Sequence, residues 1–286
     1  LDAGAKHIRV EIEQGGKSLI RVTDDGVWMD SEDAALSLVR HATSKINDIK
    51  DLFFLSTMGF RGEALASISS VSRFALLTCQ RGHSVGTEIV VEGETITPKQ
   101  IPATEGTSVV VRDLFYNVPA RLKFLKSDKA EFLHILKFIQ SMTLIYPHHV
   151  FVLISDRKTA FQVSGNGRLE DIIAGVFSLE VATDMRPIHY ESEGITIKGM
   201  ISTPAQTRID RDKQWFFVNR RLVHSDLLSK ALRNTTFSIF PPSRHPYVFL
   251  EVECDSSEVD VNVHPAKLDV KFRAENAVYK ALQKSV

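Results

Sequence analysis

The feature that most constrains the fold is a pair of alternating stretches near the start of the chain. His7 to Glu13 alternates apolar and polar side chains, Gly15-Gly16 supplies a turn, and Ser18 to Asp24 alternates again. An alternation with a period of two is typical of strands that bury only one face. The pattern predicts a β-hairpin that ends in acidic residues.

Further strand-like and helical stretches favour a mixed architecture. Apolar residues at helical spacing predict one helix over 31–40 and a longer one over 129–144. Strands are expected at 73–79, 87–91, 107–114, 150–154 and 159–163. Antiparallel strands on one side and long helices on the other predict an open α+β sandwich for this part of the chain.

The second half predicts another α+β unit. Gly165-Asn166-Gly167 follows a strand and precedes a new helical pattern, so we expect two domains, 1–167 and 168–286. Strands are expected at 195–202, 214–219, 247–254 and 259–263, with helices over 169–177 and 225–234 and at the end of the chain.

The composition limits the possible classes of protein. The chain has 286 residues, of which 43% are hydrophobic, and this is enough for two domains. Its 35 basic and 35 acidic residues cancel, so any contact with nucleic acid must come from local patches. Two cysteines in apolar stretches favour a reducing compartment, and no apolar run is long enough for a membrane span. We therefore expect a soluble, cytoplasmic protein.

Two glycines enclose an arginine at the centre of the first half. Gly59, Phe60, Arg61 and Gly62 are followed by an alanine-rich helical pattern. The glycines allow a tight turn with exposed amides, and the helix adds the positive end of its dipole, so the segment suits a phosphate group. A plain turn before a helix explains these residues equally well when they are taken alone.

Other stretches carry side chains suited to a nucleotide. Asp24 could accept a hydrogen bond from an exocyclic amine, Gly26 would let a flat ring approach, and the Thr107 hydroxyl could act at the same ring edge. A polar loop offers hydroxyls and an ammonium group to phosphate oxygens through Thr43, Ser44 and Lys45. Lys267 follows a strand and Pro265, which could aim its ammonium group at a ligand. Ordinary turns and a solvated surface remain the alternatives.

Basic residues cluster twice. One cluster comprises Arg121, Lys123, Lys126 and Lys129, and the other comprises Arg220, Arg221, Lys230 and Arg233. Either could contact a phosphate backbone, although a solvated helix face would give the same pattern. The second cluster is the candidate DNA contact.

Taken in order, these stretches resemble the N-terminal ATPase region of the MutL family of DNA mismatch-repair proteins. This family shares its ATP-binding fold with gyrase B, the heat-shock chaperone ATPase and histidine kinases. The motifs are Asp24-Asp25-Gly26, His41 to Lys45, Gly59 to Ile68, Asp113 to Arg121 and Val259 to Lys267, and the resemblance covers essentially the whole chain. The last two stretches disfavour a topoisomerase or chaperone relative.

The resemblance implies an ATP-binding α/β sandwich followed by a ribosomal-protein-like, transducer-like second domain. Asp24 would accept the adenine amine, Gly26 would lie beneath the ring, and Thr107 would be the hydroxyl partner. The lid around the triphosphate would comprise Thr43, Ser44, Lys45, Gly59, Phe60, Arg61 and Gly62. The catalytic Lys267 would reach the γ-phosphate from the second domain.

The sequence departs from the family pattern in two places. In the family, a general-base glutamate and a magnesium-binding asparagine precede the Leu1 to Ala5 stretch, and neither is in this chain. Trp28 replaces the second glycine of the Asp-x-Gly-x-Gly pattern. We therefore expect ATP and Mg²⁺ as cofactors and slow hydrolysis in the intact protein, with little turnover by these 286 residues alone.

Two functions remain open from the sequence. The first is an ATP-dependent switch in mismatch repair that forms a homodimer and coordinates DNA, a mismatch-recognition protein and downstream repair enzymes. The alternative is a module that binds DNA and partners without needing nucleotide. The basic clusters and the absent catalytic residues support the alternative.

Overall fold

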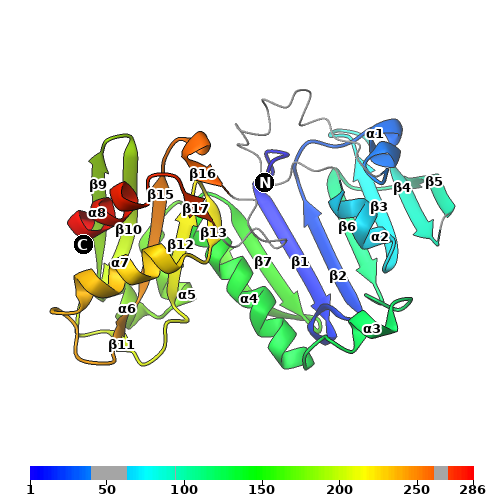
Figure 1. Cartoon of the computed structure of the whole chain (residues 1–286). Helices are drawn as coiled ribbons and strands as arrows, with labels where there is room; N and C mark the ends of the chain where they lie inside the picture. Colours follow the sequence, from blue (N-terminus) through cyan, green and yellow to red (C-terminus); the bar gives the residue numbers. More distant parts are fainter. Residues whose placement is uncertain (40–62, 94, 261–269) are drawn as a thin grey trace. The chain divides into compact units, whose positions relative to one another are not determined.

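The computed structural model describes residues 1–39, 63–93, 95–260 and 270–286 (Figure 1). These residues form two compact units that divide between Arg168 and Leu169. The domain boundary expected from the sequence, between 167 and 168, lies one residue from this division. Each unit combines a β-sheet with helices, so the α+β class predicted from the sequence is confirmed.

An eight-stranded sheet forms the first unit, in the order β5-β4-β3-β6-β2-β1-β7-β8. Its strands are β1 (His7–Glu13), β2 (Leu19–Asp24), β3 (Arg73–Cys79), β4 (Val85–Glu92), β5 (Thr95–Pro102), β6 (Gly106–Arg112), β7 (Val150–Ser155) and β8 (Lys158–Ser164). Neighbours are antiparallel except β1 and β7, which are parallel. The predicted hairpin of β1 and β2 is confirmed, with the short 3-10 turn η1 (Gln14–Gly16) between the strands.

Three of the four helices in the described part of the first unit begin at a polar or proline residue. They are α1 (Ser31–Leu36), α2 (Ala64–Ser69), α3 (Pro119–Leu122) and α4 (Asp128–Ile145). The Asp30 carboxylate accepts a hydrogen bond from the Asp33 N–H at 2.7 Å, and the Ser127 hydroxyl accepts one from the Ala130 N–H at 3.4 Å. These caps satisfy amide groups that have no partner within the helix.

One face of this sheet carries the helices (Figure 1). Residues of α1 and the turn after it pack on β3, β4 and β6 through Ala34, Leu38, Phe74, Leu76, Ile89, Val91 and Val111. Farther along the same face, a side chain on Gly16 would touch both Ile20 of β2 and Ile135 of α4. The opposite face carries charged residues, where the Glu11 carboxylate pairs with Arg9 at 2.8 Å and Arg21 at 3.3 Å. The core of the first unit therefore lies on one side of its sheet.

The second unit has a five-stranded sheet in the order β13-β12-β15-β10-β9. Its strands are β9 (Met185–Ser192), β10 (Ile195–Ser202), β12 (Gln214–Val218), β13 (Arg221–Val223) and β15 (Val248–Glu253). Short pairs join β11 (Thr207–Arg208) to β14 (His245–Pro246) and β16 (Val259–Asp260) to β17 (Lys271–Phe272), with the 3-10 turn η3 (Ser256–Glu258) before β16. Strands β12 and β15 run parallel, and the other neighbours run antiparallel.

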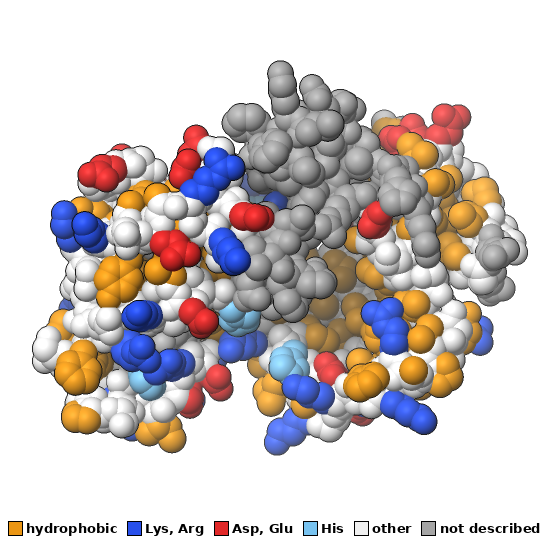
Figure 2. Space-filling model, in the orientation of Figure 1, with side chains coloured by type: hydrophobic (Ala, Val, Ile, Leu, Met, Phe, Trp, Pro, Cys, Tyr) orange, Lys and Arg blue, Asp and Glu red, His pale blue; other side chains and the backbone are white. Residues whose placement is uncertain are grey.

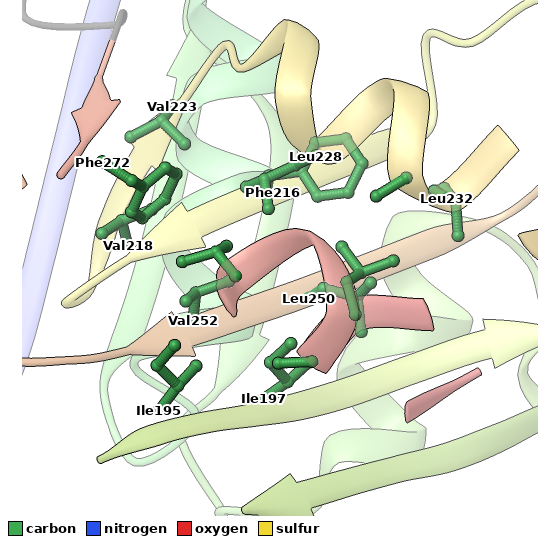
Figure 3. Close-up of a cluster of buried hydrophobic side chains, with 14 of the residues drawn as sticks. Ile195, Ile197, Phe216, Val218, Val223, Leu228, Leu232, Leu250, Val252 and Phe272 are labelled. Carbon is green, nitrogen blue, oxygen red and sulfur yellow. The ribbon is translucent and has the colours of Figure 1, made fainter. Parts of the chain in front are cut away.

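Helices lie on both faces of the second sheet (Figure 1). They are α5 (Leu169–Val176), α6 (Leu179–Asp184), α7 (Asp226–Thr236) and α8 (Glu275–Ser285). Figure 3 shows Leu228 and Leu232 of α7 directed at Phe216 and Leu250 of the sheet, within one buried cluster that also includes α8 residues. On the other face, the Phe177 ring after α5 lies 5.4 Å from the Trp215 ring.

Some elements differ from those predicted. The sequence analysis missed β5, α6 and β9 and the short strands β11, β13 and β14, and it extended the first helix to residue 40 although α1 ends at Leu36. Strand β5 contains Pro98, which a strand tolerates at the edge of a sheet, where β5 lies. Strand β6 ends at Arg112 instead of 114, because Asp113 has a φ of 52° and turns the chain out of the sheet.

Candidate functional site

A row of polar side chains crosses the helix-covered face of the first unit at one end of its strands. Asp24 of β2 pairs in register with Thr107 of β6, and Thr107 pairs with Thr78 of β3, which in turn pairs with Thr87 of β4. The three threonines are buried and Asp24 is half-buried. Because alternate residues of these strands form the apolar cluster, the row marks the point where the core becomes polar.

Asp24 and Thr107 keep hydrogen-bonding capacity that the other members of the row use internally. The Thr78 hydroxyl accepts a hydrogen bond from the Met29 N–H at 2.9 Å. The Asp24 Oδ1 atom accepts one from the Gly26 N–H at 2.9 Å, whereas its Oδ2 atom has no hydrogen-bond partner among the described residues. The Thr107 hydroxyl likewise has none within this part of the chain. A free carboxylate oxygen beside a free hydroxyl suits an amine-bearing ring edge.

Gly26 is required here because the chain passes close to it. A Cβ atom at this position would lie 2.8 Å from the Ala3 Cβ atom and 2.9 Å from both the Ala3 carbonyl oxygen and the Asp24 carboxylate. The structure therefore gives Gly26 a packing role, in addition to the ring approach expected from the sequence. Trp28, the residue that departs from the family pattern, is half-buried.

A pocket of about 540 Å³ opens on the opposite face of the same strands. It is lined in part by Thr23, Leu77 and Ser108, which are register partners on the face away from Asp24. Thr107 contributes to its wall, but Asp24 and Gly26 do not. This pocket is therefore distinct from the proposed base site.

The phosphate half of the predicted site lies outside the described residues. This applies to Thr43, Ser44, Lys45, Gly59, Phe60, Arg61, Gly62 and Lys267. Of the predicted nucleotide-site residues, the structure brings together Asp24, Gly26 and Thr107. The convergence of Asp24 with the glycine-bracketed segment and Lys267 stays a prediction.

Sequence reasoning missed Thr78 and Asp25, which support this site. Thr78 follows two leucines in an apolar strand and gives no motif of its own. Its position opposite Thr107 depends on pairing between strands that are distant in the sequence. Asp25 was read only as part of the Asp-Asp-Gly motif.

The predicted DNA-binding residues lie on two elements of the second unit. Arg220 occupies the turn between β12 and β13 with a φ of 66°, and Arg221 begins β13. The Arg220 N–H donates to the buried Glu251 carboxylate at 3.0 Å, which fixes the turn. Lys230 and Arg233 are exposed on α7, three residues apart and so on one side of the helix.

Arg233 also belongs to a basic surface that the sequence did not predict. Burial lowers the pKa of His245, and the positive charges of Arg211 and Arg233 lower it further, while Asp210 acts to raise it. Arg211, Arg233 and His245 therefore lie close enough to interact electrostatically. Arg244 is held nearby by a 2.9 Å hydrogen bond from its Nε atom to the Thr207 hydroxyl. Figure 2 shows basic side chains gathered around a histidine on the face of the second unit below α7.

Comparison with known proteins identifies the family. Residues 173–286 match the family model described as "DNA mismatch repair protein, C-terminal domain". The DNA mismatch repair protein MutL of Thermoanaerobacter sp. (strain X514) is 41% identical over 287 aligned residues, which cover 100% of this chain and 47% of that protein.

This chain belongs to the MutL family. It spans about half the length of the relatives that it matches. The predicted resemblance is thus confirmed over the whole chain.

Solved structures support the same assignment. The Aquifex aeolicus MutL ATPase domain complexed with ADP has a TM-score of 0.68 and 27% identity to this MutL-family chain, covering 100% of it and 92% of that domain. The B-subunit of DNA gyrase from Myxococcus xanthus shares the fold, with a TM-score of 0.60, 11% identity and coverage of 98% and 82%. In the described part of the chain, no helix has the length and apolar character needed to cross a bilayer.

Proposed function

We propose that the first unit binds ATP and that nucleotide binding switches the protein between two states during DNA mismatch repair. The observation that carries this proposal is the pairing of Asp24 with Thr107 at the end of an apolar core, where a carboxylate oxygen and a hydroxyl both lack hydrogen-bond partners among the described residues. The Aquifex aeolicus relative was solved with ADP, which supports a nucleotide as the ligand.

The base would bind through its exocyclic amine. This amine would donate to the Asp24 Oδ2 atom, while the Thr107 hydroxyl would bond a neighbouring ring nitrogen. The Gly26 N–H holds the other carboxylate oxygen at 2.9 Å, so the acceptor is oriented before the ligand arrives. Such pre-orientation reduces the entropy lost on binding.

The phosphates would be held by residues outside the described part of the chain. We infer this role for Thr43, Ser44, Lys45, Gly59, Phe60, Arg61 and Gly62, with Lys267 at the γ-phosphate. A contact made only to the γ-phosphate would distinguish the ATP state from the ADP state, because a ligand shifts an equilibrium only through contacts that differ between the states. Homodimerisation and the coordination of DNA, a mismatch-recognition protein and downstream enzymes would follow from that difference.

We infer that ATP and Mg²⁺ are the cofactors. Bound ATP with Mg²⁺ would supply the terminal phosphoanhydride bond, which water would cleave slowly in the intact protein to give ADP and phosphate. Within the described residues, no group of three or more His, Cys, Asp or Glu side chains could hold a metal ion. Little turnover by the 286 residues alone and a cytoplasmic location stay predictions.

Calorimetric titration of ADP into the chain tests base binding. In Asp24→Asn, the Gly26 N–H keeps Oδ1 in place, so the amide NH₂ group is turned toward the ligand amine and two donors face each other. We expect affinity to fall about tenfold or more, the scale of a lost hydrogen bond to a charged group. Thr107→Val should weaken binding less. Thr87→Val is a matched control, because Thr87 is equally buried but bonds to Gln100 at 3.2 Å. Equal affinities in Asp24→Asn and Thr87→Val would contradict the proposal.

A second function, DNA binding by the second unit without nucleotide, is favoured by its basic surface. Neither Arg211 nor Arg233 forms a salt bridge with any described residue, so both guanidinium groups remain available to phosphates. Binding through such contacts falls with salt in proportion to the number of phosphates neutralised.

DNA titrations at two salt concentrations, with and without a non-hydrolysable ATP analogue, separate the two functions. Nucleotide-independent binding would favour the module. Arg233→Ala should weaken binding and lower the salt slope by about one phosphate contact. Arg73→Ala, which removes an arginine paired with Asp113 at 3.3 Å in the first unit, is the control.

A further inference from the structure

The Asp25 side chain joins the Asp24 to Gly26 turn to the beginning of β1. Its Oδ1 atom accepts hydrogen bonds from the Lys6 N–H at 2.7 Å and the His7 N–H at 2.8 Å. Its Oδ2 atom lies 2.5 Å from the His7 Nδ1 atom. One carboxylate therefore satisfies two adjacent backbone donors and a ring nitrogen on another strand.

Two more hydrogen bonds fix the residues that follow Asp25. The Val27 N–H donates to the Ala3 carbonyl oxygen at 2.9 Å, and the Met29 N–H donates to the Thr78 hydroxyl at 2.9 Å. Between these contacts, Gly26 leaves no room for a side chain against Ala3. Asp25, Val27 and Met29 each form a hydrogen bond to another part of the chain. These bonds fix the turn that follows Asp24.

The Asp25 carboxylate stays charged near neutral pH because its pKa is low. Partial burial acts to raise the pKa of Asp25, but the hydrogen bonds from His7 and Lys6 outweigh it and hold the pKa at about 2. The carboxylate is therefore ionised wherever the protein would work. Hydrogen bonds to an ionised acceptor are shorter and stronger than those between neutral groups.

We propose that Asp25 is a positioning residue that sets the affinity and base selectivity of the nucleotide site. It does not face the ligand position. By fixing the turn after β2 to the beginning of β1, it holds the Gly26 N–H where that group orients the Asp24 carboxylate. This inference rests on the proposed binding of an adenine nucleotide, and it adds a residue that acts through its neighbours.

Paired substitutions separate geometry from charge. Asp25→Asn keeps an oxygen that can accept from the Lys6 and His7 N–H groups, so it should bind ADP within about threefold of the wild type. Asp25→Ala removes both acceptor atoms, and we expect ADP affinity to fall about tenfold, the equivalent of one lost charge-assisted hydrogen bond. Its preference for ADP over GDP should fall as well, because a displaced Asp24 no longer selects the amine. If the two variants bind ADP equally, geometry is not the cause and the proposal is wrong.

A matched control tests whether any lost carboxylate has this effect. Asp210 also has a pKa of about 2, held there by hydrogen bonds from Arg208, but it lies in the second unit. Asp210→Ala should leave the affinity and the ADP preference unchanged. A variant that merely loosens the fold would lower the melting temperature without changing base selectivity, and that outcome would overturn the proposal.

Amide hydrogen exchange gives a measurement that does not depend on nucleotide. In Asp25→Ala, the amides of residues 26 and 27 should exchange faster than in Asp25→Asn. If the wild-type chain binds no ADP, the proposed function fails, and the selectivity claim fails with it. Unchanged exchange in Asp25→Ala would instead show that Asp25 does not fix the turn, even if ADP binds. Should Asp25→Ala not fold, Thr78→Val removes the Met29 anchor of the same turn and is expected to weaken ADP binding in the same way.

Discussion

The two sheets differ in how their faces are used. In the second unit, all four residues of Trp215–Val218 in β12 are buried, and so are all five of 248–252 in β15. In the first unit, β2 has one buried residue, Leu19, and the row that includes Asp24 is polar. A sheet buried on both faces reads as a continuous apolar run, whereas a sheet with one open face can end its core in polar groups. The core of the first unit therefore ends in polar groups, whereas β12 and β15 of the second unit are buried on both faces.

The two units also differ in how their buried polar groups are paired. Glu251 of the second unit is 5% exposed, but its carboxylate contacts the Lys198 ammonium at 3.4 Å and the Arg220 N–H at 3.0 Å. Burial acts to lower the pKa of Lys198, yet the hydrogen bond from its ammonium to Glu253 and the charge of Glu251 raise it. Thr107 of the first unit is 8% exposed and has no such partner among the described residues. The Thr107 hydroxyl is not one of the fully enclosed polar atoms that lack a partner, so it stays accessible beside Asp24, as the proposed nucleotide site requires.

The largest expected effect tests the continuous core of the second unit. Phe217 is fully buried, so Phe217→Ala should lower the free energy of unfolding of the second unit by about 3 to 5 kcal/mol through lost contacts and a cavity. Thr107→Val keeps the shape of the side chain and removes a hydroxyl that bonds to no described residue, so it should leave the first unit within about 1 kcal/mol of the wild type. Each unit contains one tryptophan, Trp28 or Trp215, so Trp→Phe backgrounds report on each unit separately in urea. If Phe217→Ala lowered the unfolding free energy of both units equally, the contrast between the two cores would be wrong.

An intermediate effect tests the crowded turn of the first unit. Gly26→Ala would place a methyl group 2.8 Å from the Ala3 Cβ atom, and we expect a loss of about 1 to 3 kcal/mol from overpacking. Gly175→Ala is the control, because it lies in α5 with no atom within 4 Å of the added Cβ, and it should be neutral or stabilising. Thermal unfolding followed by the fluorescence of each tryptophan measures both variants. A first unit that tolerates Gly26→Ala without loss would mean that Ala3 can move away.

Some of these features could be predicted from the sequence, and others could not. The hairpin of β1 and β2 was evident because its alternation and turn are local. The family resemblance predicted Asp24 and Thr107 at one ring edge but not their direct pairing, since that pairing joins distant segments through a register that the whole sheet determines. The same holds for the basic surface, where Arg211, Arg233 and Arg244 come from separate segments. Motif resemblance supplied the expected roles of Asp24 and Thr107, and the structure supplied their neighbours.

The smallest expected effect concerns the charge that holds the turn of the first unit. The folded pKa of Asp25, about 2, lies below the value of about 3.9 for an aspartate in an unfolded chain. The folded state therefore binds the proton less readily than the unfolded state, so the contribution of Asp25 is complete above pH about 4 and is lost as the pH falls toward 2. We expect the difference in unfolding free energy between the wild type and Asp25→Asn to shrink as the pH falls from about 4 toward 2.

Urea unfolding followed by Trp28 fluorescence in a Trp215→Phe background, repeated at each pH down to the lowest at which the first unit stays folded, measures that difference. Asp210→Asn should give the corresponding trend only in the second unit, because Arg208 holds the Asp210 carboxylate there. The Asp25 carboxylate is partly exposed, so solvent screening keeps the effect small and added salt should reduce it further. A difference that stayed the same at every pH would mean that the hydrogen bonds from Lys6 and His7 bind the neutral acid as well as the carboxylate, and the turn would then depend on shape alone.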